Sequence, residues 1–237
     1  MKVIAFSGWK ESGKDMCADY LGVSLGAKKL SFADPLKVIV AEQYGVPLEH
    51  MYDQKYKEKA IVTMPVSPRD GFSEKIAEML KKEFRCSDGR QYDDFYLNKD
   101  EQQLYGHDRA EQTSHPLYWT PRALCILEGS IKRSADPSYW VSRAVNKADK
   151  DGTYLIADLR YKNEANTLIK LREEGKIEKL VLIRLNRWEK SPSDDPSERD
   201  LDDYELFDAH IHNKDSEKVL KIEVFQQLEG VLKKVNF

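Results

Sequence analysis

The feature that most constrains the fold of this chain is an apolar strand that runs directly into a loop bounded by glycines. Residues 2–7 read Lys-Val-Ile-Ala-Phe-Ser, and residues 8–14 read Gly-Trp-Lys-Glu-Ser-Gly-Lys. Behind the loop, apolar side chains recur at helical spacing at Met16, Cys17 and Tyr20. A strand, a Gly-x4-Gly-Lys loop and a helix in this order are typical of a phosphate-binding loop.

The chemistry of such a loop explains why it binds phosphate. Its glycines let successive backbone amide groups point at phosphate oxygens, and the positive N-terminal end of the following helix adds to the attraction. Lys14 is long enough to reach the β- and γ-phosphates of ATP. The ATP-binding residues predicted from this stretch are Gly8, Lys10, Ser12, Gly13, Lys14, Asp15 and Met16.

The residue after Lys14 departs from the usual pattern, which has Ser or Thr there to bind Mg²⁺. Here it is Asp15, whose carboxylate is also a hard oxygen ligand for Mg²⁺, directly or through water. The alternative interpretation is a chance glycine-rich turn in which Asp15 only favours the helix N-terminus.

Composition predicts the class of protein and of ligand. With 237 residues, 41% hydrophobic and 33% charged, the chain is the size of one soluble α/β domain, residues 1–237, with room for an insertion. The net charge of −3 provides no broad basic field for a nucleic-acid polymer, so a small phosphorylated ligand fits better.

Cysteine usage and hydropathy predict the compartment. Cys17, Cys86 and Cys125 are odd in number and have no ligand-like spacing, which argues for a reducing compartment and against a disulfide or zinc framework. Met1 leads straight into the first strand, and no apolar run approaches the roughly 20 residues that a membrane span needs. We expect a cytoplasmic protein without a membrane partner.

A second strand is predicted over residues 27–32, followed by a helix that ends at Gly45. Asp34 is the expected N-cap and Pro35 the first helical residue. Lys37 lies in the first turn, where a cation opposes the helix dipole. Either an anion lies nearby, or Lys37 is an ordinary solvated lysine.

Residues 46–118 differ from both flanks, since charges are dense and turn residues are frequent. Only Phe72–Phe84 shows a clear amphipathic pattern. We interpret the segment as an insertion with small helices, serving either as a flap over a site or as a surface excursion.

The next predicted helix runs from Thr120, its N-cap, to Gly129, with Pro121 at the first position. Arg122 adds a planar bidentate donor to the N-terminal end of this helix, which favours an anion site. Arg133 follows a few residues on.

A further helix is expected to begin at Asp136 and Pro137. Its packing face carries Tyr139, Trp140 and Val141. We interpret Trp140 as a core residue rather than a platform for a ligand.

The apolar run 153–158 ends in an acid and continues as Leu-Arg. Because ligands lie at the carboxyl ends of parallel strands, Asp158 and Arg160 are expected at the same sheet edge as the phosphate loop. Asp158 is suited to hold Mg²⁺ and Arg160 to hold a phosphate, with Glu164 in support. The alternative is a surface Asp-Arg pair at a strand end.

After a buried strand over 180–185, residues 186–207 are polar and rich in turn residues. They form either a solvated loop or a lid whose Arg187 and Arg199 deliver positive charge to a phosphate site. A last strand over 207–213 and a helix capped by Ser216 complete the chain.

This order of elements predicts a doubly wound α/β domain. With the phosphate loop, it predicts a three-layer P-loop NTPase fold with a parallel sheet and a helical or irregular insertion.

Several short motifs follow one another along the chain in a specific order. They are Gly-x-Lys-x-Ser-Gly-Lys-Asp at 8–15, Phe-Ala-x-Pro-Leu-Lys at 32–37, Arg-x-Leu at 122–124 with Gly-Ser at 129–130, Tyr-Trp-Val at 139–141, Asp-x-Arg with a trailing Glu at 158–164, and Ser-Glu and Asn at 197, 198 and 213. In this order they resemble the bacteriophage deoxynucleoside monophosphate kinases. The resemblance covers nearly the whole chain except residues 46–118. It implies a fold similar to that of nucleoside monophosphate kinases, with residues 46–118 as an insertion or a monophosphate-binding region, and a place in the host cytoplasm if a phage encodes the chain.

The resemblance implies transfer of the ATP γ-phosphoryl group to a deoxynucleoside 5′-monophosphate, with Mg²⁺ at Asp15 and Asp158. The catalytic residues that it implies are Lys14, Asp158, Arg160, Arg187 and Arg199. The acceptor contacts are Asp34, Lys37, Arg122, Arg133, Trp140, Arg160 and Glu164. The chain departs from the family at Ile126, where the family usually carries Gln.

Two other functions stay open. The first is another small-molecule P-loop kinase, resembling dephospho-coenzyme A or phosphomevalonate kinase. The second is a nucleotide-binding module without transferase activity, which would hydrolyse ATP slowly and phosphorylate no acceptor. The accepted bases, the choice between deoxyribose and ribose, and a homodimer are left open as well.

Overall fold

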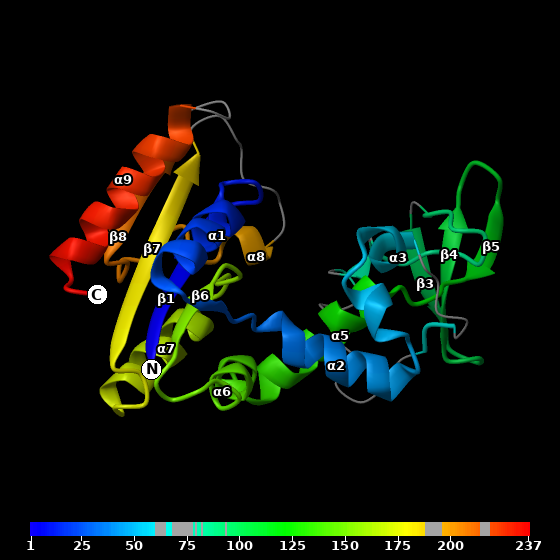
Figure 1. Ribbon diagram of the computed structural model, residues 1–237. Helices are drawn as coiled ribbons and strands as arrows, with labels where there is room; N and C mark the ends of the chain where they lie inside the picture. The colour runs from blue at the N-terminus through cyan, green and yellow to red at the C-terminus, as the bar shows by residue number, and fades with distance from the viewer. Residues whose placement is uncertain are drawn as a thin grey trace. The chain divides into compact units, whose positions relative to one another are not determined.

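The chain forms two compact units (Figure 1). The computed structural model describes residues 1–59, 65–67, 78, 80–81, 83–92, 94–187, 196–213 and 219–237. The core unit consists of Met1–Ala33 together with Pro137–Phe237, and the inserted unit of Asp34–Asp136.

A parallel five-stranded sheet, in the order β2-β6-β1-β7-β8, organises the core unit. Its strands are β1 (Lys2–Ser7), β2 (Lys28–Lys29), β6 (Thr153–Ile156), β7 (Lys179–Arg187) and β8 (Ala209–Asn213). Every residue from Val3 to Phe6 is fully buried. Since successive strand residues face opposite sides, both faces of the sheet are covered, and the α/β prediction with a parallel sheet is confirmed.

Among its described residues, the core unit has the helices α1 (Lys14–Leu25), α6 (Tyr139–Val145), α7 (Lys162–Glu173), α8 (Pro196–Arg199) and α9 (Val219–Lys234). Helices α1, α7 and α9 pack against the sheet. Leu21 of α1 and Leu228 of α9 pack in one buried cluster with Ile4 and Phe6. The crossovers β1-α1-β2 and β6-α7-β7 run in opposite directions along the sheet, so right-handed connections put α1 and α7 on opposite faces.

The inserted unit has a small antiparallel sheet, in the order β3-β4-β5, and a hydrophobic core of its own. Its elements are α2 (Ala33–Tyr44, beginning one residue before the unit), η1 (Leu48–Met51), α3 (Gln54–Lys59), β3 (Asp94–Asn98), β4 (Gln103–Asp108), β5 (Thr113–Pro116) and α5 (Pro121–Ala135). Met51, Phe84, Trp119 and Leu124 are among its buried residues. The sequence did not predict this sheet, because its strands are short and mostly half-exposed.

Two predicted helix starts are wrong. Helix α2 begins at Ala33 rather than after an N-cap at Asp34, because the Ala33 amide donates to Ser31 Oγ at 3.1 Å and to Asp158 Oδ2 at 3.3 Å. Helix α6 begins at Tyr139 rather than at Asp136, since the Asp136 amide closes α5 by donating to the Lys132 carbonyl.

The predicted end of α5 at Gly129 is also wrong, although its predicted cap is confirmed. Thr120 Oγ1 accepts from the Ala123 amide at 3.1 Å, and Pro121 opens the helix. The helix then continues to Ala135, because Gly129 is not among the glycines with positive φ and so does not adopt the left-handed conformation that commonly ends a helix. The helix predicted over 72–84 lies mostly, and Ser216 wholly, outside the described residues.

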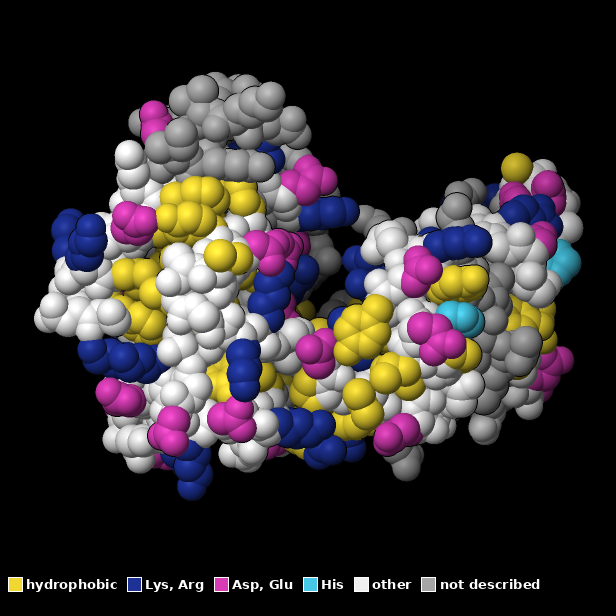
Figure 2. Space-filling view, in the orientation of Figure 1, with side chains coloured by type: hydrophobic (Ala, Val, Ile, Leu, Met, Phe, Trp, Pro, Cys, Tyr) yellow, Lys and Arg dark blue, Asp and Glu magenta, His cyan; other side chains and the backbone are white. Residues whose placement is uncertain are grey.

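Positive and negative side chains are mixed on the visible face of the molecule. On the face shown in Figure 2, lysine and arginine side chains are interspersed with aspartate and glutamate. None of the helices in the described part of the chain is long and apolar enough to cross a membrane.

Candidate active site

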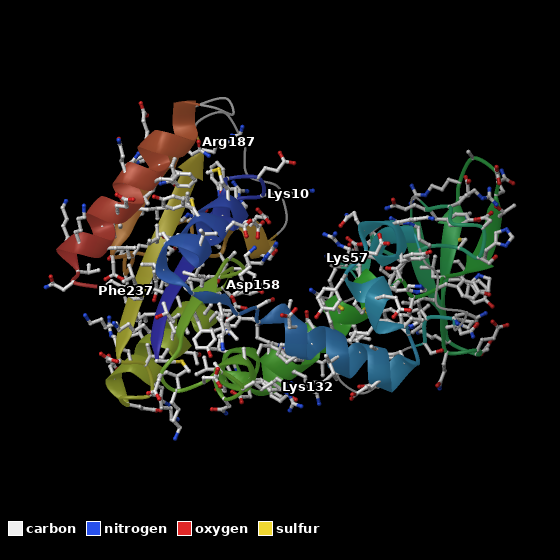
Figure 3. All side chains as sticks on the ribbon, viewed as in Figure 1. Lys10, Lys57, Lys132, Asp158, Arg187 and Phe237 are labelled. Carbon is white, nitrogen blue, oxygen red and sulfur yellow. The ribbon has the colours of Figure 1, made fainter. Side chains whose placement is uncertain are left out.

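The loop between β1 and α1 leaves the sheet at its carboxyl edge, where Figure 3 marks Lys10 and Arg187. Gly8 has φ +152° and Gly13 has φ +102°. A Cβ on Gly8 would lie 2.5 Å from the carbonyl oxygen of Leu185, which is closer than real contacts allow. Backbone geometry therefore requires glycine at the first position of the Gly-x4-Gly-Lys pattern, and it favours glycine at the second.

Lys14, at the start of α1, folds back over the loop. Its Nζ donates to the carbonyl oxygen of Gly8 at 2.6 Å and to that of Trp9 at 2.7 Å. Burial lowers the pKa of the Lys14 ammonium to about 8, an effect that nearby Glu198 opposes and Arg160 reinforces. A phosphate in the loop would favour the charged form.

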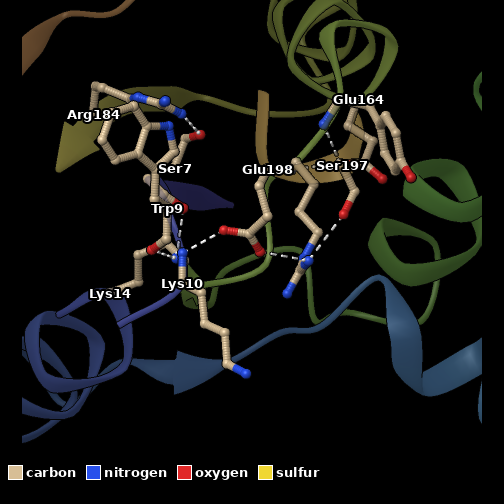
Figure 4. A network of polar contacts seen from close by, with 11 residues as sticks. Ser7, Trp9, Lys10, Lys14, Glu164, Arg184, Ser197 and Glu198 are labelled. Atoms are coloured by element: carbon tan, nitrogen blue, oxygen red, sulfur yellow. Dashed lines mark hydrogen bonds and ion pairs between the residues drawn. The ribbon is translucent and has the colours of Figure 1, made fainter. Parts of the chain in front are cut away.

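A glutamate from α8 lies against this loop (Figure 4). The Lys10 amide donates to Oε2 of Glu198, and an Arg160 guanidinium nitrogen donates to Oε1 at 3.0 Å. Arg160 also donates to Ser197 Oγ at 3.2 Å. Glu198 is 9% exposed, so its carboxylate is a nearly buried bridge between the loop backbone and a guanidinium group.

A buried arginine of β7 ties the loop to the sheet. Arg184 is 5% exposed and donates to Ser7 Oγ at 2.8 Å and to Asp202 Oδ1. Trp9 Nε1 donates to the same Asp202 oxygen at 2.8 Å. Burial lowers the pKa of Arg184, and the Asp202 carboxylate opposes that shift by compensating the buried charge.

Asp158 lies level with the end of β1, because Ile156 of β6 is paired with Ala5. Its Oδ2 accepts from Ser31 Oγ at 2.7 Å and from the Ala33 amide at 3.3 Å. These contacts hold the carboxylate at the carboxyl edge of the sheet, as expected from the sequence.

The two carboxylates predicted to hold Mg²⁺ are those of Asp15 and Asp158. Asp15 is exposed in the first turn of α1, and Asp158 is half-buried. No group of three or more His, Cys, Asp or Glu side chains among the described residues is arranged to hold a metal by itself. Mg²⁺ is commonly held by one or two carboxylates together with substrate phosphates, so this donor set fits that ion in chemical type.

Glu164 supports Arg160, as predicted, but through the backbone. Glu164 is 5% exposed, and its Oε2 accepts from the amide of Arg160 at 2.9 Å and from that of Tyr161 at 3.1 Å. The guanidinium of Arg160 is left to contact α8.

Of the two predicted lid arginines, only one has a described contact with the loop. Arg187 ends β7 and donates to the Glu11 carbonyl at 2.8 Å. Arg199 is exposed at the end of α8. Residues 188–195 of the predicted lid lie outside the described part of the chain.

Four predicted acceptor residues belong to the inserted unit. Lys37 Nζ lies 3.5 Å from Asp34 Oδ1 and 3.9 Å from the centre of the Tyr52 ring, so Lys37 is not simply solvated. Arg122 Nε lies 3.3 Å from Glu83 Oε1, and Arg133 is in the last turn of α5.

The other three predicted acceptor residues, Trp140, Arg160 and Glu164, belong to the core unit. Arg160 and Glu164 lie at the loop as described above, whereas Trp140 lies in the core. It is 4% exposed and packs edge-to-face on Tyr139, with the ring centres 4.7 Å apart. The interpretation of Trp140 as a core residue is confirmed.

Sequence reasoning missed Arg184, Asp202, Ser31 and the placement of Glu198. Arg184 carried a usable signal, because a charge inside the apolar run 180–185 must find a partner. The others stand in polar stretches where one acid or hydroxyl is not distinguishable from its neighbours.

Comparisons with known proteins add no family assignment. A scan against protein-family models found no matching family, and a search of curated proteins found no matching relative.

Proposed function

We propose that this protein is a P-loop phosphotransferase that uses ATP to convert deoxynucleoside 5′-monophosphates to diphosphates. The observation that carries the proposal is the loop after β1, which has glycines at positive φ and Lys14 at the start of α1. Open α/β sheets bind ligands at the carboxyl ends of their strands, and helix N-termini attract phosphate. The sequence resemblance supplies the acceptor class and the assignment to a three-layer fold similar to nucleoside monophosphate kinases.

In the proposed reaction, a phosphate oxygen of the acceptor attacks the γ-phosphorus of ATP. The bond from that phosphorus to the β–γ bridging oxygen breaks, which gives ADP and the deoxynucleoside diphosphate. No general base is needed because the nucleophile is already an anion, so catalysis consists of positioning and charge stabilisation.

Each residue at the loop then has a role. The loop amides and Lys14 hold the donor phosphates, and Arg160 holds the acceptor phosphate. Arg187 and Arg199 neutralise charge on the transferring group. Asp15 and Asp158 would hold Mg²⁺, which neutralises phosphate charge when bound. Acceptor contacts from the inserted unit, with Arg122 foremost, stay predictions from the sequence.

The assignment of donor and acceptor roles is tested by Lys14→Ala and Arg160→Ala, with Lys170→Ala as the control. Lys170 is a largely exposed cation on α7 that pairs with Glu174. Calorimetric titration with ATP should show about tenfold or greater weakening for Lys14→Ala, since a charge-assisted contact is lost. Arg160→Ala should instead raise the KM for the monophosphate, and Lys170→Ala should change neither quantity.

Equal loss of ATP affinity in both site variants would overturn the separation of donor and acceptor roles. Failure of the wild-type protein to transfer phosphate to any deoxynucleotide would overturn the function itself.

A further inference from the structure

The carboxylate of Glu198 stands where donors for an anion converge. One oxygen accepts from the loop amide of Lys10, and the other accepts from Arg160 at 3.0 Å. Loop amides and guanidinium groups are the donors that bind phosphate in proteins. Figure 4 shows the carboxylate between the loop backbone and the guanidinium group.

The segment that carries Glu198 is anchored by other contacts. Asp200 Oδ2 accepts from the Lys162 amide at 2.6 Å, and Leu201 is 2% exposed. Asp202 accepts from both Trp9 and Arg184. Because these contacts hold the segment without Glu198, the Glu198 side chain is free to exchange its partners while its backbone stays in place.

The loop has a second feature that points to a ligand. The Ser12 side chain is 1% exposed, and its hydroxyl has no hydrogen-bond partner among the described residues. This oxygen lies beside Gly8, 2.6 Å from the position that a Cβ there would take. A buried hydroxyl without a partner is costly unless a ligand completes its hydrogen bonds.

We propose that Glu198 is a built-in competitor for phosphate, whose carboxylate occupies the anion site of the loop until a nucleotide phosphate displaces it. The proposal rests on the proposed function, since the same loop and Arg160 are to bind the substrate phosphates. A carboxylate and a phosphate cannot accept from the same donors at once, and their like charges repel. Displacement of Glu198 also releases Arg160, whose guanidinium then turns to the phosphate.

The test compares Glu198→Gln with Asp203→Asn by calorimetric titration with inorganic tripolyphosphate. The glutamine keeps the size of the side chain but removes the competing charge. Asp203 belongs to the same acidic segment, and its side chain is 78% exposed beside Lys162 rather than the loop. Glu198→Gln should bind tripolyphosphate about tenfold more tightly than the wild-type protein, while Asp203→Asn should stay within about twofold.

Equal or weaker binding by Glu198→Gln would overturn the proposal, because Glu198 would then support the loop rather than compete for it. The thermal unfolding midpoint of each variant shows that the compared proteins are folded.

Lys14→Ala separates this failure from failure of the proposed function. If Lys14→Ala loses tripolyphosphate binding and Glu198→Gln gains nothing, the competitor role alone is overturned. If Lys14→Ala binds like the wild-type protein, the loop is not a phosphate site, and the competitor role and the proposed function fall together. A gain in Glu198→Gln without phosphoryl transfer to any acceptor supports the competitor role and contradicts only the kinase.

Discussion

Gly8 lies in the loop proposed to bind phosphate, and its backbone geometry requires glycine. It has φ +152°, and a Cβ there would lie 2.5 Å from the Leu185 carbonyl oxygen. We expect Gly8→Ala to lower the free energy of unfolding by about 1–3 kcal/mol and to weaken ATP binding, because the loop must shift to admit the methyl group. Denaturant unfolding and calorimetric titration measure the two effects.

Gly230→Ala is the matched control for that substitution. Gly230 lies inside α9, and a Cβ there would meet nothing within 4 Å. Alanine should therefore raise the stability by roughly 0.5–1 kcal/mol and leave ATP binding unchanged. If both alanine variants behaved alike, the geometric requirement at Gly8 would be refuted.

The three cysteines form no disulfide. Burial raises the pKa of Cys17 to about 12 and that of Cys125 to about 11, and it also raises the pKa of Cys86. Since the thiolate is the reactive form, iodoacetamide at pH 8 should label the folded protein slowly and the denatured protein at all three sites. Peptide mass spectrometry locates the label, and rapid modification of Cys17 in the folded protein would contradict this account.

The raised pKa of Cys17 also makes the stability of the fold depend on pH. The folded pKa of Cys17 lies above its ordinary value of 9.0, so the folded state keeps the proton over a range where the unfolded state loses it. The contribution of this thiol to the free energy of unfolding is therefore complete below pH 9, and it is lost as the pH rises towards about 12.

Single residues also mark the limit of prediction from sequence. Gly8, Gly13 and Lys14 were predictable because their spacing follows from how a backbone encloses phosphate. Glu198 was not, since it is one acid among several in a polar stretch and its role depends on where α8 folds back.

At the scale of elements, β8 supports the loop through its last residue. Asn213 is 8% exposed, and its Nδ2 donates to the Ser12 carbonyl at 3.0 Å. We expect Asn213→Leu to destabilise the protein by about 1–3 kcal/mol, because a buried carbonyl loses its donor, and to weaken ATP binding.

His212→Thr is the control on the same strand, at an exposed position. It should change stability by less than about 0.5 kcal/mol and leave ATP binding intact. Unchanged ATP affinity in Asn213→Leu would show that the loop does not depend on β8.

Elements with apolar runs were predictable, and elements formed by tertiary contacts were not. Strands β1 and β7 contain continuous apolar stretches, residues 3–6 and 180–183, as is typical of buried parallel strands. Strands β3, β4 and β5 lack such runs. The end of α5 was predicted at Gly129, whereas the helix runs through this glycine to Ala135, and no local pattern separates a glycine inside a helix from one that ends it.

At the scale of the whole molecule, the described residues of each unit include a buried hydrophobic core of that unit's own. Leu124 lies in the inserted unit and Leu155 in the core unit, and both are fully buried. We expect Leu124→Ala to lower the free energy of unfolding by about 2–5 kcal/mol while the folded protein still binds tripolyphosphate with wild-type affinity. The loop, Lys14, Arg160 and Glu198 all belong to the other unit.

Leu155→Ala, in β6 of the core unit, is the counterpart. It should lower the free energy of unfolding by a similar amount. It should also weaken tripolyphosphate binding, because Leu155 packs in the same buried cluster as residues of α1. Equal effects of the two substitutions on binding would contradict the independence of the two cores.

The measurement that tests the central claim most directly is acceptor-dependent formation of ADP. A coupled assay with Mg-ATP is run with each common deoxynucleoside and ribonucleoside monophosphate in turn, for the wild-type protein and Lys14→Ala. The account predicts that at least one deoxynucleoside monophosphate accelerates ADP formation and that Lys14→Ala abolishes the acceleration. No acceleration by any of these acceptors, in a folded protein that binds ATP, would contradict it.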